Sequence, residues 1–600
     1  MSAGSPDHPN HKLDTASTGN QAMTGAQGVA QVIAAQQNPV VYGMPGGYTV
    51  QIYDALYFLG DKVTTRLVRE EAFATVMAEA QGRLTGRPAF VLGQGAWVLG
   101  NAGIGIMEAH LGCSPMVVLV DATEGGAFSH LGPYQVGSGG YGAYDLAAAL
   151  KAITKETFVA LDPTQAIQMT QLAIKHSTAG EPGPVAVVFH GKSLFECVNG
   201  AVQPPLGPIT KRLSFDPASP SPEAVTSAAA LLSQSKTPVI VAGNGVRLSK
   251  AQAELMAFAE ALDIPVATTP AGKGTFAEDH ALATGLMGAF GHETANAIVG
   301  QSDLIIAVGT KLGASDTASL HPKLIRPDAQ KIIQIDTEAL NVGWTLPVEV
   351  GIVADAKAGL KALLEQCQSL GVGGVGGVGR FNGKDRVSQA RKTHGYFDRK
   401  PTSSAGNFSG RDAVAMLAKH LPDGSIATCD AGENRLFMLR DFQCRGKTSV
   451  LQPNGGGGMG YAVPAAISAA LNTDTPQAVA VCGDGGISMT LHALMTALEN
   501  KANLMVVVLD NSILGWVYNG QRGRVIASEL KQFDYAAIAR AMGCHAISTD
   551  DPETFERELK AAIGRPGVNM LVARTTRVDR YQDVMSSLHT KDIYAVPEEP

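Results

Sequence analysis

The sequence predicts an α/β protein with three doubly wound parallel-sheet domains in series. Short runs of β-branched and other apolar residues, such as PMVVLVDA at 115–122 and LMVVVLD at 504–510, recur along the chain between helical segments. Strands that are apolar throughout and alternate with helices are typical of parallel sheets covered by helices on both faces. The chain has 600 residues, about four times the length of a typical domain. The length and the pattern together therefore predict a protein of several α/β domains.

Changes in composition divide the chain. Residues 1–26 are rich in Ser, Gly, Asn and Pro and are predicted to form a disordered tail. The segment 203–222 is rich in proline, and GVGGVGGVGR opens a glycine-rich linker over 371–404. We therefore expect domains at 27–200, 223–370 and 405–590.

Each block contains several predicted strands. They are 88–93, 115–122 and 184–189 in the first block, 237–243, 264–270, 303–309 and 331–336 in the second, and 425–430, 478–486, 504–510 and 569–574 in the third. Ligands of open α/β sheets bind beyond the carboxyl ends of the strands. Residues that directly follow these runs are therefore the candidates for function.

Composition excludes several functional classes. Lys and Arg number 47 against 54 Asp and Glu, a net charge of −7, and no basic stripe indicates a nucleic-acid partner. No apolar run is long enough to cross a membrane. Seven scattered cysteines without a CxxC pair predict neither a disulfide framework nor a zinc site. The first residues lack the apolar core of a signal peptide, so we expect a cytoplasmic protein.

The strongest chemical signal lies where two apolar runs of the third block end. The first run leads into Gly483-Asp484-Gly485-Gly486, and the second leads into Asn511, 27 residues after Asp484. Crossover connections of parallel strands bring such ends together at one sheet edge, with a helix expected over about 488–498. Carboxylate and amide oxygens suit Mg²⁺. Glycines and a helix N-terminus suit a diphosphate.

This spacing resembles the cofactor-binding signature of the thiamin diphosphate enzymes. The resemblance implies that Asp484, Asn511 and the carbonyl of Ile513 hold Mg²⁺. A second stretch, NGGGGMGYAVPAAISAAL at 454–471, resembles the family's loop before the metal-binding strand. It implies that Met459 keeps the cofactor bent and that the carbonyl of Gly457 accepts a hydrogen bond from its aminopyrimidine. Taken alone, GDG is often an ordinary turn, and a methionine often fills a core.

A third stretch, VREEAFATVMAEAQGRLTGRPAF at 68–90, resembles the family's pyrimidine-domain helix. The alignment implies that Glu71 is the catalytic carboxyl, which bonds the aminopyrimidine and activates the cofactor. That role requires a carboxyl in a site of low dielectric constant. Glu70 is interpreted as part of a solvated helix face.

From about residue 27 to 590 the chain resembles the acetolactate synthase and 2-oxo acid decarboxylase branch of this family. GMPGGYTVQIYDAL at 43–56 is similar to the opening of acetolactate synthases, so Gly46 and Gly47 are substrate-site candidates. The resemblance also implies a cofactor site between the first domain of one chain and the third domain of another, and therefore a homodimer or tetramer. The implied cofactor-binding residues are Glu71, Gly432, Glu433, Asn434, Gly457, Met459, Gly483, Asp484, Gly485, Gly486 and Asn511.

The sequence departs from acetolactate synthases near the expected substrate. The family has a loop of the pattern G-P-G-x-x-N, and here the corresponding segment is GQGAWVLGN at 93–101. Asn101 is the candidate for the asparagine of that loop. Tyr141-Gly142-Ala143 replaces a stretch with an active-site Gln, which predicts a remodelled substrate loop over 121–145. Trp516 is a substrate-site candidate or a core residue, and Val517 stands where simple pyruvate decarboxylases tend to carry a Glu.

The implied reaction is cleavage or ligation of a C–C bond of a 2-oxo acid such as pyruvate, on a small-molecule carbonyl substrate. The alternative is a decarboxylase, or a lyase or hydrolase acting on a larger acyl-CoA or diketone. FAD is expected to be absent because Lys311-Leu312-Gly313-Ala314-Ser315 replaces the family's flavin anchor.

Two other functional classes fit the sequence less well. A nicotinamide oxidoreductase needs a GxGxxG run after a strand, and no such run follows a predicted strand. A non-catalytic homologue would be expected to have lost Glu71, Asp484 or Asn511, and all three are present.

Overall fold

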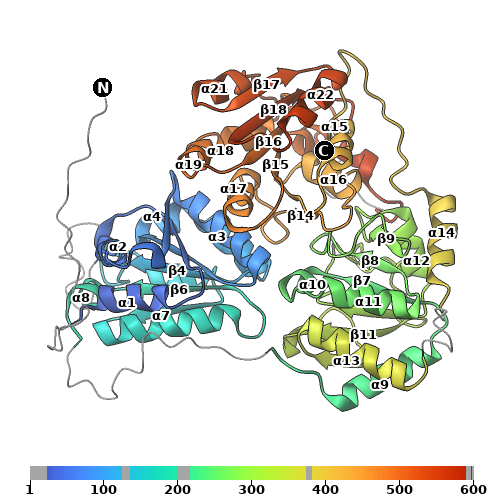
Figure 1. The fold of residues 1–600 in the computed structure, drawn as a ribbon, viewed down its shortest axis with the longest axis horizontal. Coiled ribbons are helices and arrows are strands. Elements are labelled where there is room, and N and C mark those ends of the chain that lie inside the picture. Colours follow the sequence, from blue (N-terminus) through green and yellow to red (C-terminus); the bar gives the residue numbers. More distant parts are fainter. Residues whose placement is uncertain (1–22, 124–134, 199–216, 373–380, 590–595, 597–600) are drawn as a thin grey trace.

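The computed structural model describes residues 23–123, 135–198, 217–372, 381–589 and 596. Within them the chain forms three sheets of six strands each, one after another along the sequence. Figure 1 shows the N-terminal domain in blue and cyan, the central domain in green and yellow, and the C-terminal domain in orange and red. The predicted fold class, three parallel-sheet α/β domains in series, is therefore confirmed.

The N-terminal sheet lies between two apolar cores. Helices α1 and α7 cover one face, and α3 and α5 cover the other. Its strands are β1 (Val40–Gly43), β2 (Thr64–Leu67), β3 (Ala89–Gln94), β4 (Met116–Asp121), β5 (Glu156–Ala160) and β6 (Pro184–Phe189). Its helices are α1 (Gly25–Ala34), α2 (Val50–Tyr57), α3 (Glu71–Thr85), α4 (Gly95–Asn101), α5 (Gly103–Leu111), α6 (Leu146–Lys151), α7 (Pro163–Thr178) and α8 (Gly191–Phe195), with short 3-10 turns η1 (Gly47–Thr49) and η2 (Gly60–Lys62).

The central domain has its own sheet and two apolar cores. Its strands are β7 (Pro238–Ala242), β8 (Val266–Thr268), β9 (Ala283–Leu286), β10 (Leu304–Val308), β11 (Lys331–Asp336) and β12 (Val350–Val353). Its helices are α9 (Pro222–Gln234), α10 (Asn244–Leu248), α11 (Gln252–Leu262), α12 (Glu293–Gln301), α13 (Ala356–Ser369) and α14 (Gly383–His394), with η4 (Ala339–Asn341).

The C-terminal domain carries the third sheet. Its strands are β13 (Ile426–Cys429), β14 (Ser449–Leu451), β15 (Ala478–Gly483), β16 (Leu504–Asp510), β17 (His545–Thr549) and β18 (Val568–Arg574). Its helices are α15 (Gly410–His420), α16 (Glu433–Arg440), α17 (Ala462–Asn472), α18 (Asp484–Thr490), α19 (Ala493–Glu499), α20 (Gly515–Gly520), α21 (Tyr535–Ala541) and α22 (Pro552–Ala562), with η5 (Tyr581–Val584).

The first and third sheets share one strand order. The N-terminal order is β2-β1-β3-β4-β6-β5, and the C-terminal order is β14-β13-β15-β16-β18-β17. The central sheet differs, with the order β12-β11-β10-β7-β8-β9. In the C-terminal sheet, β15 pairs with β16 in parallel, from Ala478 opposite Leu504 to Gly483 opposite Leu509. The predicted juxtaposition of the segments after these two strands is therefore correct.

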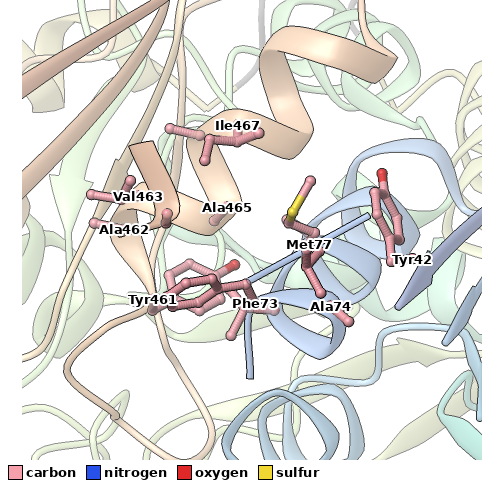
Figure 2. Packing of buried hydrophobic residues seen from close by; sticks show 14 of the residues in the cluster. Tyr42, Phe73, Ala74, Met77, Tyr461, Ala462, Val463, Ala465 and Ile467 are labelled. Carbon is pink, nitrogen blue, oxygen red and sulfur yellow. The ribbon is translucent and has the colours of Figure 1, made fainter. Parts of the chain in front are cut away.

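Helix α3 of the N-terminal domain packs against α17 of the C-terminal domain. Figure 2 shows Phe73, Ala74 and Met77 on α3 facing the segment that starts with Tyr461 and continues into α17. These side chains belong to one core that runs from the first domain into the third. The hydroxyl of Ser468 on α17 also donates a hydrogen bond of 2.7 Å to the carbonyl of Met77. The two domains are thus joined through a buried apolar contact.

Two segments differ from the expectation. The helix expected over about 488–498 begins earlier, at Asp484, and a second helix follows from Ala493. The low helix propensity of Gly485 and Gly486 hid this start in the sequence. The expected linker over 371–404 contains α14, while residues 373–380 lie outside the described part of the chain.

Helix α14 is polar, which explains why its pattern predicted no helix. Its guanidinium groups hold it to the central domain. Arg386 donates to the carbonyl of Pro238 at 2.9 Å, and Arg391 donates to the carbonyl of Ala283 at 2.6 Å. These hydrogen bonds add to a narrow apolar contact, in which Val387 is buried, where an ordinary surface helix has a broad apolar stripe.

Gly82 allows α3 to approach the start of β4. A Cβ added to Gly82 would lie 2.2 Å from the carbonyl oxygen of Pro115. We expect Gly82→Ala to reduce the free energy of unfolding by about 1–3 kcal/mol because the helix must shift in a packed core. The thermal unfolding midpoint measures this. Gly100→Ala is the control, because a Cβ at that helical glycine meets no atom within 4 Å. An equal midpoint for the two variants would contradict the prediction.

Candidate functional site

A cavity of about 120 Å³ opens at the carboxyl end of the third sheet. Ligands of open α/β sheets bind at this edge. Segments after β13, β15 and β16 and the first turns of α16, α18 and α20 form its walls. Of the residues predicted for the site, the lining includes Gly432, Glu433, Asn434, Met459, Gly483, Asp484, Gly485, Gly486, Asn511, Ile513 and Trp516.

Asp484 is the first residue of α18 and is 3% exposed. Its Oδ1 accepts a hydrogen bond from the amide of Gly485 at 2.9 Å. Its Oδ2 is buried and has no hydrogen-bond partner among the described residues, and the same holds for Oδ2 of Asp510. Burial and the nearby charge of Asp510 raise the pKa of Asp484 to about 7. Two buried carboxylates with free oxygens form a site of unsatisfied negative charge.

Asn511 and Ile513 follow β16 and complete this wall of the cavity. The Oδ1 of Asn511 accepts a hydrogen bond of 3.3 Å from the amide of Ile513, which places the two residues together. The described residues contain no group of three His, Cys, Asp or Glu side chains that could hold a metal ion. The Mg²⁺ ligands that the resemblance implies include only one of these side chains, Asp484. The other two ligands are the amide oxygen of Asn511 and the carbonyl oxygen of Ile513. This donor set and the free Oδ2 atoms fit Mg²⁺, which keeps other positions for water and phosphate.

Glycines bring the backbone close to the cavity. A Cβ added to Gly486 would lie 2.0 Å from Oδ2 of Asp430, and one added to Gly485 would lie 2.8 Å from Cε of Met459. Met459 therefore lies against the start of α18, and its role in keeping the cofactor bent stays a prediction. Gly457 adopts φ +64° in the loop before Met459 and is not among the residues that line the cavity.

The α16 side of the cavity holds a further buried carboxyl, that of Glu433. Oε1 of Glu433 accepts hydrogen bonds from Nδ2 of Asn519 at 2.7 Å and from the amide of Tyr581 at 2.9 Å. Burial raises the pKa of Glu433 to about 7. Asn434 on α16 points back to the segment after β13, because its Nδ2 donates a hydrogen bond to the carbonyl of Asp430 at 2.9 Å.

Glu71 lies on the N-terminal domain, at the first residue of α3. Nδ2 of Asn101 donates a hydrogen bond to its Oε2 at 3.1 Å. The structure thus brings together two residues that the sequence analysis named separately. The residues that line the cavity all lie between Gly410 and Asp579, so Glu71 of the same chain does not line it.

Gly46 and Gly47 lie at the carboxyl edge of the N-terminal sheet. Gly47 has φ +54°, and a Cβ there would lie 2.3 Å from Oδ2 of Asp121. That oxygen accepts a hydrogen bond of 2.6 Å from the amide of Tyr48, while Oδ1 accepts one of 3.1 Å from Gly95. Asp121 therefore ties together the segments after β1, β3 and β4.

Two interpretations need refinement. Glu70 does not simply face solvent, because its Oε2 lies 2.9 Å from Nε2 of His492 on the C-terminal domain. Trp516 lines the cavity, but its ring also stacks on Tyr581 with centroids 5.2 Å apart. Part of the loop over 121–145, residues 124–134, lies outside the described part of the chain.

Asp430, Asp510 and Asp121 are buried acidic residues that were not predicted from the sequence. Each stands at the carboxyl end of an apolar strand, the same kind of position that Asp484 occupies. Ligands of open α/β sheets bind beyond the carboxyl ends of the strands, so a search for acidic residues at every strand end would have found all three.

A larger cavity of about 1060 Å³ lies between the N-terminal and central domains. Lys311, Gly313, Ala314 and Ser315, which replace the family's flavin anchor, line it. Lys311 forms an ion pair with Glu181 across this cavity. The expectation that FAD is absent stays a prediction.

No helix in the described part of the chain is long and apolar enough to span a membrane. Three family models match successive parts of the chain. They describe the thiamine pyrophosphate enzymes: the N-terminal TPP binding domain matches residues 23–135, the central domain 225–363, and the C-terminal TPP binding domain 430–573.

Curated relatives align over most of the chain. A probable acetolactate synthase large subunit of Methanocaldococcus jannaschii is 29% identical over 90% of this chain and 90% of its own length. An acetolactate synthase large subunit of Corynebacterium glutamicum is 28% identical over 89% and 83%. The large subunit of acetolactate synthase isozyme 3 of Escherichia coli is 27% identical over 94% and 96%.

The three matched domains occur in the order of the three sheets, and the cavity lies in the domain that matches the C-terminal TPP binding model. The relatives align across all three domains. The chain therefore belongs to the thiamin diphosphate (thiamine pyrophosphate) enzymes, in their acetolactate-synthase-like branch.

Proposed function

We propose that this protein is a thiamin diphosphate- and Mg²⁺-dependent carboligase that acts on a 2-oxo acid such as pyruvate. The observation that carries the proposal is the cavity that holds Asp484, Asn511 and Met459 together at the end of the third sheet. The names of the relatives, acetolactate synthase large subunits, favour pyruvate and ligation. Val517, which lines the cavity, offers no acidic group where simple decarboxylases tend to carry one.

In this proposal Asp484, Asn511 and the carbonyl of Ile513 hold Mg²⁺. The unpartnered Oδ2 of Asp484 is available to a cation, and a nearby divalent charge favours the ionised form of this carboxyl. The close-packed glycines after β15 leave room for a diphosphate beside the metal. Gly486 cannot carry a side chain, because Asp430 occupies that space.

The bound cofactor supplies a nucleophilic carbon and an electron sink for breaking and forming C–C bonds beside a carbonyl. The protein's part is to orient it and to move protons. Met459 lines the cavity, and the carboxyl of Glu71, which Asn101 orients, would give a proton to the aminopyrimidine of the bound cofactor and take it back.

We further propose that two chains form each site. Glu71 does not line the cavity of its own chain, so in this proposal the Glu71 that serves the cavity comes from a second copy. A homodimer is then the smallest active unit, and a tetramer is compatible with it.

The first test is the reaction itself. Purified protein with thiamin diphosphate and Mg²⁺ is expected to consume pyruvate, release CO₂ and form acetolactate, which NMR detects. Protein without Mg²⁺ and thiamin diphosphate is the control. Acetaldehyde as the sole carbon product would contradict ligation. Unchanged pyruvate in the presence of bound cofactor would contradict the proposed substrate.

Glu71→Gln is expected to lower kcat by ~10²-fold or more, because the amide cannot exchange a proton with the cofactor. Affinity for thiamin diphosphate, measured by calorimetry, should change little. Glu70→Gln is the matched control, since its carboxylate meets His492 instead. Wild-type turnover in Glu71→Gln would refute the assignment.

Mixing two inactive variants tests the shared site. Asp484→Ala is expected to lose Mg²⁺-dependent cofactor binding, and Glu71→Gln to lose turnover. A hybrid dimer of the two contains one site with both native residues, so co-expression should restore activity. If each site were built within one chain, the hybrid would stay inactive. Co-expression of differently tagged Asp484→Ala chains is the control.

A further inference from the structure

Helix α5 of the N-terminal domain lies along the glycine-rich loop 454–458 of the C-terminal domain. Ile104, Glu108 and Leu111 share one face of this helix. A Cβ added to Gly458 would lie 2.6 Å from Cδ1 of Ile104, and one added to Gly455 would lie 2.3 Å from Cβ of Leu111. The loop backbone thus touches the helix, and its glycines permit that approach.

Glu108 binds the loop through three backbone amides. Its Oε1 accepts hydrogen bonds from Asn454 at 2.7 Å and from Gly455 at 3.0 Å, and its Oε2 accepts one from Gly456 at 2.8 Å. Glu108 itself is 1% exposed. Hydrogen bonds to an ionised acceptor are stronger than neutral ones, so this carboxylate is a firm anchor.

Arg83 holds the same carboxylate and the same loop. Its Nη2 lies 3.0 Å from Oε1 of Glu108, and its Nη1 donates to the carbonyl of Gln452 at 2.7 Å. Arg83 is fully buried and also pairs with Glu79. Glu79 does not bond the loop amides. Its oxygens accept hydrogen bonds from the hydroxyls of Ser114 and Tyr461, each at 2.7 Å.

The anchored loop leads directly into the cavity. Gly458 connects to the end of β13, because its carbonyl accepts a hydrogen bond of 3.4 Å from the amide of Ala431. Met459, the next residue, lines the cavity. Gly455 and Gly456 are exposed in the chain, and glycine loses more backbone entropy on ordering than any other residue. Without an anchor, water would satisfy these amides and the loop would sample other conformations.

We propose that Glu108 is a positioning residue that fixes loop 454–458 in the conformation that presents Gly457 and Met459 to the cofactor. This inference rests on the proposed function, because it assigns the loop to the thiamin diphosphate site. Glu108 belongs to the N-terminal domain, yet it acts on the cavity of its own chain, whereas Glu71 of the same domain serves a second chain.

The test compares Glu108→Gln with Glu79→Gln. Both variants neutralise a buried carboxylate beside Arg83, but only the first disturbs the loop amides, since an NH₂ group then faces an N–H donor. Affinity for thiamin diphosphate with Mg²⁺ is measured by calorimetry. Hydrogen exchange of peptides over 452–461 is measured by mass spectrometry without cofactor. Glu108→Asp, which keeps the charge but is one carbon shorter, provides a second variant if Glu108→Gln does not fold.

We expect Glu108→Gln to raise the Kd of thiamin diphosphate ~10-fold and to speed exchange in 452–461, while exchange in α13 stays unchanged. The Kd and the exchange rate of Glu108→Asp should lie between those of Glu108→Gln and the wild type. Glu79→Gln should lower the thermal midpoint but leave the Kd within about twofold. An unchanged Kd in Glu108→Gln, unchanged loop exchange, or an equal rise in Kd in Glu79→Gln would overturn the proposal. Failure of the proposed function would show differently, as wild-type protein that does not bind thiamin diphosphate.

Discussion

The rest of the structure depends on one buried charge at the contact between the first and third domains. The guanidinium of Arg83 stays ionised under all ordinary conditions and is fully buried, so it requires acceptors on every side. Glu79 and Glu108 supply them from the N-terminal domain, and the carbonyl of Gln452 supplies one from the C-terminal domain. A shift of one domain against the other would break the hydrogen bond to Gln452 and leave one buried N–H of the guanidinium without an acceptor. The apolar packing of α3 on α17 provides the contact, and Arg83 fixes its geometry.

Helix α3 takes part in both halves of the proposed site. Glu71 occupies its first turn, and Arg83 follows twelve residues later, about 18 Å along the helix axis. One end therefore presents Glu71, the proposed catalytic carboxyl, and the other end holds the loop that leads into the cavity of the same chain. In the proposed dimer these two ends serve different cavities. A single rigid element then links the two sites.

The two halves of the proposed site, the cavity in the C-terminal domain and the surroundings of Glu71 in the N-terminal domain, differ in the charges that they carry. The cavity collects carboxyl groups that burial holds at raised pKa values, Asp484 and Glu433 at about 7. Such a cluster is costly without a cation, so its presence beside Asn511 and Asp510 suits a divalent metal. The N-terminal half instead offers the carboxyl of Glu71, which the neutral amide of Asn101 orients. One half suits metal and diphosphate, and the other suits exchange of a proton.

The sequence by itself determined the three α/β domains and the placement of Asp484, Asn511 and Met459, because apolar strands and the residues at their ends are local features. It missed edge strands such as β2, which is mostly exposed and reads TTRL, and the polar helix α14. Only the tertiary structure decided that Asn101 meets Glu71, that Glu71 lies outside the cavity of its own chain, and that Glu108 binds loop 454–458. These contacts join residues far apart in the sequence, and no local period or spacing encodes which distant side chain will satisfy a buried charge or a backbone amide.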